Sequence, residues 1–132
     1  MPGAAPIPAV LRSRQSGPLG IHLILELYNC REDIIRDNDL LSEGLVRAVR
    51  EAGATIVESV FHEFSPGGLS GVVVIAESHV TIHTWPEHRY AAIDAFTCGD
   101  PNLPNRIERN LIDFLAAEQF NSTYLDRGLP QA

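Results

Sequence analysis

Apolar and polar residues alternate along several short segments of the chain, which is the pattern of strands with one buried face. In residues 20–28 every second position is a large aliphatic residue: Ile21, Leu23, Leu25 and Leu27. Segments rich in β-branched and aromatic residues predict further strands over residues 55–62, 70–76, 79–84, 90–96 and 121–125. Turn residues separate them, above all the run Ser-Pro-Gly-Gly at residues 65–68.

Two other segments have the spacing of amphipathic helices. The first begins at Asp37 or Asn38, either of which can cap a helix, and runs to about Ala52, where Gly53 can end it. The second is predicted over residues 103–119. The residues expected to face the sheet are Leu41, Leu45, Val46 and Val49 in the first helix and Ile107, Leu111, Phe114 and Leu115 in the second. The element order β-α-β-β-β-β-α-β predicts an α+β fold: a two-layer α/β sandwich whose antiparallel or mixed sheet has both helices on one face.

Length and charge narrow the class of protein. The 132 residues suffice for one domain, expected over residues 19–132, and the proline-rich residues 1–18 are expected to form a disordered extension. A net charge of −7 argues against a nucleic-acid partner. The sequence has no apolar run of the ~20 residues needed to span a membrane, so no membrane partner is predicted. Two cysteines are too few for a disulfide framework and favour a reducing, cytoplasmic location.

The junction of Glu77 and Ser78 is the strongest candidate for chemistry. A serine hydroxyl can attack the preceding carbonyl in an N→O acyl shift, and β-elimination from the resulting ester leads to a pyruvoyl group. The attack needs a strained turn, donors for the oxyanion and a base for the α-proton. Ser70, His79 and His83 are the nearby candidates for the last two roles.

A pyruvoyl group would suit a chain without lysine, whose ten basic residues are all arginine, because pyridoxal phosphate is held on a lysine. The ketone forms a Schiff base with a substrate amine and accepts the electrons released when CO₂ leaves. The carbanion then needs a proton donor, and the thiol of Cys98 fits that need.

Each of these residues also has an ordinary structural interpretation. A serine at a strand break is usually a turn hydroxyl, and histidines on strands are more often hydrogen-bonded than catalytic. His79 and His83 are separated by three residues, but on a strand their rings lie about 13 Å apart, so no metal site is predicted. Spacing alone therefore leaves the self-cleavage hypothesis open.

Taken together, the motifs resemble a known family. Residues 70–87 read Ser-Gly-Val-Val-Val-Ile-Ala-Glu-Ser-His-Val-Thr-Ile-His-Thr-Trp-Pro-Glu, and residues 90–99 read Tyr-Ala-Ala-Ile-Asp-Ala-Phe-Thr-Cys-Gly. Both runs closely resemble the prokaryotic S-adenosylmethionine decarboxylase proenzymes, which are pyruvoyl enzymes of short chain length. The similarity extends to residues 19–22, 53–57 and 61–64, and covers roughly residues 19–127.

The resemblance implies roles for particular residues. Cleavage before Ser78 would leave Glu77 as a new carboxyl terminus and convert Ser78 to the pyruvoyl group, with no pyridoxal phosphate and no metal. Ser70 and His83 would assist processing, and Cys98 would be the catalytic proton donor. Phe64 matches a residue that stacks on the adenine of the small-molecule substrate, and Glu63 and Glu87 are further candidates for contact with this substrate. Short relatives act as homodimers of cleaved protomers, and their product is the aminopropyl donor for spermidine synthesis.

One departure leaves the substrate open. Glu63 stands where a basic or amide residue is expected, and residues 65–68 are less bulky than in relatives. Some similar enzymes decarboxylate arginine or ornithine, and a carboxylate near the pocket would favour such a dibasic substrate. A solvated surface charge is the simpler interpretation of Glu63. A non-catalytic partner protein of the same fold is a further alternative, although Ser78, His83 and Cys98 are all present.

Overall fold

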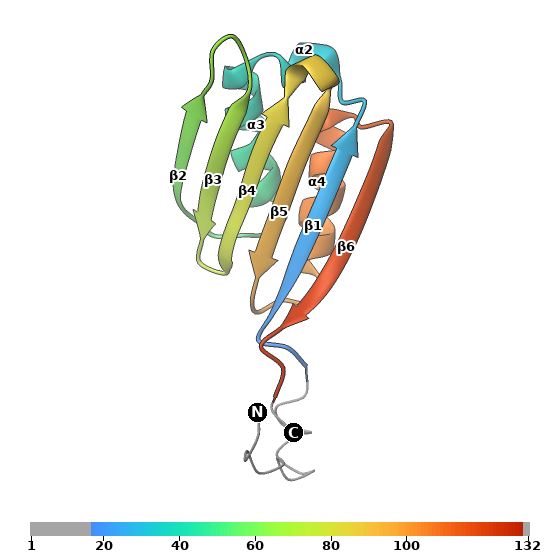
Figure 1. The fold of residues 1–132 in the computed structure, drawn as a ribbon. Helices are drawn as coiled ribbons and strands as arrows, with labels where there is room; N and C mark the ends of the chain where they lie inside the picture. The colour runs from blue at the N-terminus through green and yellow to red at the C-terminus, as the bar shows by residue number, and fades with distance from the viewer. Residues whose placement is uncertain (1–16, 131–132) are drawn as a thin grey trace, which may run out of the picture.

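The computed structural model describes residues 17–130, in which two layers meet: a six-stranded sheet and a pair of helices behind it (Figure 1). The strands are β1 Gly20–Tyr28, β2 Ile56–Glu63, β3 Leu69–Ile75, β4 Ser78–Trp85, β5 Tyr90–Thr97 and β6 Gln119–Arg127. Their order across the sheet is β2-β3-β4-β5-β1-β6, and every neighbouring pair is antiparallel. The predicted α+β sandwich is confirmed, and its sheet is antiparallel throughout.

The two long helices, α3 Asn38–Glu51 and α4 Leu103–Leu115, lie on the same face of the sheet, as predicted (Figure 1). Asp37 caps α3 by accepting hydrogen bonds from the backbone N–H groups of Asp39 and Leu40. Helix α4 ends four residues earlier than the sequence predicts, because Ala116 adopts a left-handed conformation and Gln119 already begins β6. Among the described residues, no helix combines the length and the apolar character needed to cross a membrane.

Short elements and one extension were not predicted. The four-residue helix α2 Glu32–Ile35 and the 3₁₀ turn η1 Pro86–His88 are too short to show a helical period in the sequence. Strand β6 is longer than the predicted segment 121–125. The expected disordered extension over residues 1–18 lies almost wholly outside the described part of the chain.

The core lies between the sheet and the helices. Alternation along β1 points Leu23, Leu25 and Leu27 into it, and all three are fully buried. Helices α3 and α4 approach closely at Gly44, where an added Cβ would overlap the ring of Phe114. A larger residue at this crossing would require the Phe114 ring to move, so the two helices are packed closely against each other as well as against the sheet.

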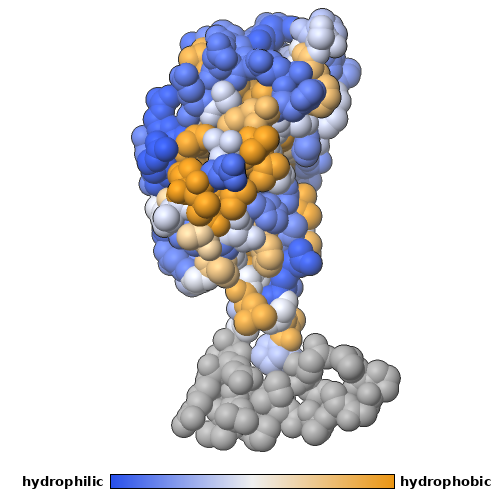
Figure 2. All heavy atoms as spheres, turned by 90° about the vertical axis from the view of Figure 1, so that its left-hand side faces the viewer, coloured by the Kyte–Doolittle hydropathy of each residue, from blue (hydrophilic) through white to orange (hydrophobic). Residues whose placement is uncertain are grey.

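The other face of the sheet has no helix over it in the described residues (Figure 1), and both polar and large apolar side chains lie on it. Exposed apolar side chains on β2 and β3 include Val60, Val72 and Val74. Seen from the β2 edge, apolar side chains gather in a patch (Figure 2). The face of the sheet that has no helices over it is named the open face below. It also holds most of the predicted site residues.

Candidate active site

The predicted cleavage bond lies in the tight turn between β3 and β4. Ser78 begins β4 with a φ of 152°, a positive value that residues with a side chain rarely adopt. The backbone N–H of Cys98 donates a 2.9 Å hydrogen bond to the carbonyl oxygen of Glu77. That oxygen would become the oxyanion if Ser78 attacked, so the Cys98 N–H is placed to stabilise it.

The side chain of Glu77 is also held in place. Its two carboxylate oxygens accept hydrogen bonds from the backbone N–H of Thr55 at 3.1 Å and from the Thr55 hydroxyl at 3.4 Å. Glu77 is therefore held at two points, its carbonyl oxygen by the residue after β5 and its side chain by the residue before β2.

Ser70 and His83, predicted separately from the sequence, form a pair. They are register partners on β3 and β4, and the Ser70 hydroxyl lies 2.7 Å from Nδ1 of His83 on the open face. Ser78 and His83 stand near opposite ends of β4, five residues apart. At about 3.3 Å per residue this places the Ser70–His83 pair about 16 Å from Ser78 within one chain.

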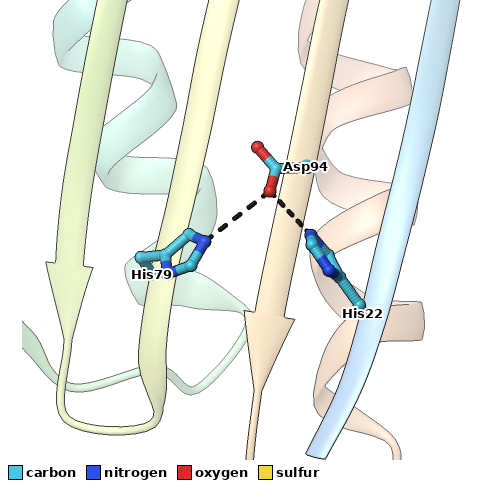
Figure 3. Close-up of side chains that lie close together, drawn as sticks. All are labelled: His22, His79 and Asp94. Atoms are coloured by element: carbon cyan, nitrogen blue, oxygen red, sulfur yellow. Dashed lines mark hydrogen bonds and ion pairs between the residues drawn. The ribbon is translucent and has the colours of Figure 1, made fainter. Parts of the chain in front are cut away.

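A second polar cluster lies next to Ser78. The Ser78 hydroxyl is 3.2 Å from Nδ1 of His79, and Nε2 of His79 is 3.6 Å from a carboxylate oxygen of Asp94 on β5. The same oxygen lies 2.7 Å from Nε2 of His22 on β1 (Figure 3). The three side chains converge from three neighbouring strands, with Asp94 in the middle.

Hydrogen bonds and neighbouring imidazoles lower the pKa of Asp94. Partial burial alone would raise its pKa, but hydrogen bonds from Thr81 and His22, together with the imidazoles of His22 and His79, outweigh burial and lower the pKa. Asp94 is therefore ionised at neutral pH. The ligand atoms of His22, His79 and Asp94 lie within 4.8 Å of one another, a grouping of residue types that can also hold a metal ion.

Sequence reasoning missed Asp94 and His22, which stand 15 residues after and 57 residues before His79. One signal was available: both are polar residues at open-face positions of the mostly apolar strands β5 and β1. Only the strand order β4-β5-β1 brings them beside Ser78.

The two cysteines differ in their exposure to solvent. Cys98 follows β5, is exposed, and lines a hollow of about 280 Å³ with residues 17–21 of the chain. Cys30 is fully buried, and burial raises its pKa to about 11 despite the opposing charge of Arg89. Cys98 is thus the accessible thiol of the pair, as its predicted role requires.

The predicted substrate-contacting residues are not gathered at one point of a single chain. Phe64 is half exposed and packs edge-on against His62, which lies on the open face as the register partner of Ser70. Glu63 is exposed and, by strand alternation, is on the opposite face from His62. Glu87 is exposed in η1, beyond the end of β4 that lies farthest from Ser78.

The sequence and fold match known proteins. The S-adenosylmethionine decarboxylase family pattern matches residues 21–128. A relative from Caldicellulosiruptor saccharolyticus, described as an S-adenosylmethionine decarboxylase proenzyme, is 46% identical over 111 residues, which cover 84% of this chain and 90% of the relative. A proenzyme of the same description from Pseudomonas aeruginosa is 48% identical, covering 84% of this chain and 69% of the relative.

A solved structure agrees. The crystal structure of the adenosylmethionine decarboxylase from Aquifex aeolicus VF5 superposes with a TM-score of 0.82 and 36% sequence identity, covering 88% of this chain and 96% of that one. Sequence and structure thus point to the same family over nearly the same residues. The chain belongs to the S-adenosylmethionine decarboxylase family.

Proposed function

We propose that this chain is a proenzyme that cuts itself between Glu77 and Ser78 and then decarboxylates S-adenosylmethionine with a pyruvoyl group made from Ser78. The observation that supports this most is the geometry of the turn: Ser78 has a positive φ, and the Glu77 carbonyl accepts the Cys98 N–H. Membership of a family whose members are described as proenzymes supports the same conclusion. Cleavage would give chains of residues 1–77 and 78–132.

Self-cleavage needs no outside reagent except water. The Ser78 hydroxyl oxygen bonds to the Glu77 carbonyl carbon, the peptide C–N bond breaks, and an ester and a free amine result. Loss of the α-proton of residue 78 then expels the Glu77 carboxylate and leaves dehydroalanine. Its imine tautomer reacts with water, ammonia leaves, and the new chain begins with the pyruvoyl group.

In the mature enzyme the pyruvoyl group would bind the substrate amine and accept the electrons released with CO₂. Cys98 would return a proton to the substrate carbon, and its thiol is exposed beside a hollow that water and substrate can enter. Phe64 offers an exposed ring on which a purine can stack, and Glu87 a carboxylate for polar groups of the substrate.

We propose further that the enzyme works as a homodimer. Ser70 and His83 lie about 16 Å along β4 from Ser78, so one chain cannot apply this pair to its own cleavage bond. A second copy packed on the open face could supply it, and the exposed Val60, Val72 and Val74 give that face an apolar surface to bury.

A mixed dimer tests this arrangement. We expect His83→Ala alone to remain uncut and Ser78→Ala alone to remain uncut. Co-expressed with different tags, the two variants should form mixed dimers in which the His83→Ala chain is cut, because its partner retains His83. Intact-mass analysis of each tagged chain gives the result, with light scattering to confirm the dimer mass. A mixed dimer in which neither chain is cut would contradict the sharing of His83.

The substrate is tested by measuring CO₂ release from carboxyl-labelled S-adenosylmethionine, arginine and ornithine with the same purified protein. We expect release from S-adenosylmethionine only, and we expect Glu63→Gln to leave this preference unchanged. The reason is that Glu63 lies on the face opposite Ser70 and His83, so its charge does not face a substrate bound there. Release from arginine or ornithine that Glu63→Gln abolishes would instead establish a pocket for a dibasic amino acid.

A further inference from the structure

We propose that His79 is the general base that removes the proton from the Ser78 hydroxyl in the first step of self-cleavage, and that Asp94 and His22 position it. This role depends on the proposed self-cleavage. It concerns removal of the proton from the Ser78 hydroxyl, a step that is not assigned to the pair Ser70–His83. The main observation is a continuous series of polar contacts from Ser78 to His79 and on to Asp94 and His22. Figure 3 shows the part of this series that joins His79, Asp94 and His22.

The contacts set the tautomer of His79. Its Nε2 faces the carboxylate of Asp94 at 3.6 Å, which favours the proton on Nε2. Nδ1 then presents a lone pair to the Ser78 hydroxyl at 3.2 Å. This is the arrangement a base needs: one nitrogen accepts the proton, and a carboxylate stabilises the charge that forms on the ring.

Asp94 is itself held from two sides. The hydroxyl of Thr81 donates to one of its oxygens, and Nε2–H of His22 donates to the other at 2.7 Å. Arg127 in turn donates to Nδ1 of His22 at 3.2 Å, which requires that nitrogen to be the acceptor and leaves the proton of His22 on Nε2. Asp94 therefore has a fixed orientation and a lowered pKa, and it faces His79 as a carboxylate.

Groups of the chain itself account for every proton and electron pair that moves in this step. The proton of the Ser78 hydroxyl moves to Nδ1 of His79 as the oxygen bonds to the Glu77 carbonyl carbon, and the negative charge on the carbonyl oxygen is held by the Cys98 N–H. When the C–N bond breaks, its electron pair goes to the Ser78 nitrogen. That nitrogen takes the proton from His79, which returns to its neutral form.

Other nearby groups are less suited to the task. The carboxylate of Glu77 is engaged by Thr55, on the other side of the turn. Within the same chain, His83 pairs with Ser70 about 16 Å away along β4. Within the described residues, His79 is the imidazole in contact with the Ser78 hydroxyl.

The test follows cleavage of freshly translated full-length chain by intact mass. We expect His79→Ala to slow cleavage about 100-fold, in line with the loss of a general base, and added imidazole to restore part of the rate, because the His79 side chain is 36% exposed. Asp94→Asn should slow it by a comparable factor, because an amide N–H facing Nε2 would put the His79 proton on Nδ1, towards Ser78. His88→Gln is the matched control and should cleave at the wild-type rate, because His88 is an exposed histidine in η1, beyond the end of β4 that lies farthest from Ser78.

Hydroxylamine identifies the step that is blocked. If His79 acts in the acyl shift, His79→Ala accumulates the amide, which hydroxylamine leaves intact. Hydroxylamine cutting of that variant at residue 77 would reveal an accumulated ester and overturn the assignment. Cleavage of His79→Ala at the wild-type rate, or wild-type cleavage that requires added zinc, would overturn it as well.

The outcomes separate this inference from the proposed function. A wild-type chain that never cuts itself refutes the self-cleaving enzyme, and the role of His79 falls with it. A wild-type chain that cuts normally while His79→Ala does the same refutes only the base. Thermal unfolding of each variant shows whether slow cleavage follows from lost stability, and rescue by imidazole is a response that lost stability cannot produce.

Discussion

Ser78→Ala is expected to give a single uncut chain of full mass with no detectable decarboxylation. Alanine keeps the backbone and the Cβ of the turn, so the positive φ and the Cys98 hydrogen bond can persist while the attacking hydroxyl is lost. Both activities should fall below detection, since the same oxygen opens the peptide bond and the same residue becomes the pyruvoyl group. Intact mass and CO₂ release measure the two effects.

Ser59→Ala serves as the control, because Ser59 is exposed on β2, away from the turn. It should yield two chains and wild-type CO₂ release. Two chains from Ser78→Ala, split at the same bond, would mean that another nucleophile opens it and would remove the basis for a pyruvoyl group derived from Ser78.

Cys98→Ala is expected to separate cleavage from catalysis. Self-cleavage should continue, because it is the backbone N–H of residue 98 that contacts the Glu77 carbonyl, and alanine keeps that N–H. Decarboxylation should fall about 100-fold or more with the loss of the proton donor, and the remaining activity should decline with turnover as protons reach the wrong carbon. Mass analysis before the assay and a time course of CO₂ release report both.

Alkylation provides an independent check on the same thiol. Iodoacetamide should modify the exposed Cys98 and inactivate the enzyme, leaving the buried Cys30, with its raised pKa, unmodified. If Cys98→Ala remained uncut, the side chain of Cys98 would have to take part in processing. Full decarboxylation by cut Cys98→Ala would assign the proton donor elsewhere.

Local patterns were enough to predict the fold class and the main helices and strands. The alternation in β1, the Asp37 cap and the glycine after α3 each depend on a few adjacent residues, and all three appear in the structure. The end of α4 was placed too late because Glu118 and Gln119 suit a helix as well as a strand edge. The pairing of β6 with β1 places Gln119 in a strand, and no local signal in the sequence shows this pairing.

The site, too, has a part that local motifs predict and a part that depends on how the strands pair. Ser78 and Cys98 stand out by motif, and their proposed roles remain predictions for experiment. The contact between the Cys98 backbone and Glu77, and the convergence of His22 and Asp94 on His79, depend on strand order and register. Spacing along the sequence could not show that Ser70 lies opposite His83, because that contact depends on the register of β3 and β4.

The strand order has a consequence for the life of the cleaved enzyme. A cut before Ser78 would assign β1, β2 and β3 to one fragment and β4, β5 and β6 to the other. Because β1 lies between β5 and β6, the two fragments are interlocked, joined along β3–β4, β5–β1 and β1–β6. Neither fragment could leave without breaking the pairing of these strands, so the cut protein would remain one body, and the topology itself would block the exchange of fragments between protomers.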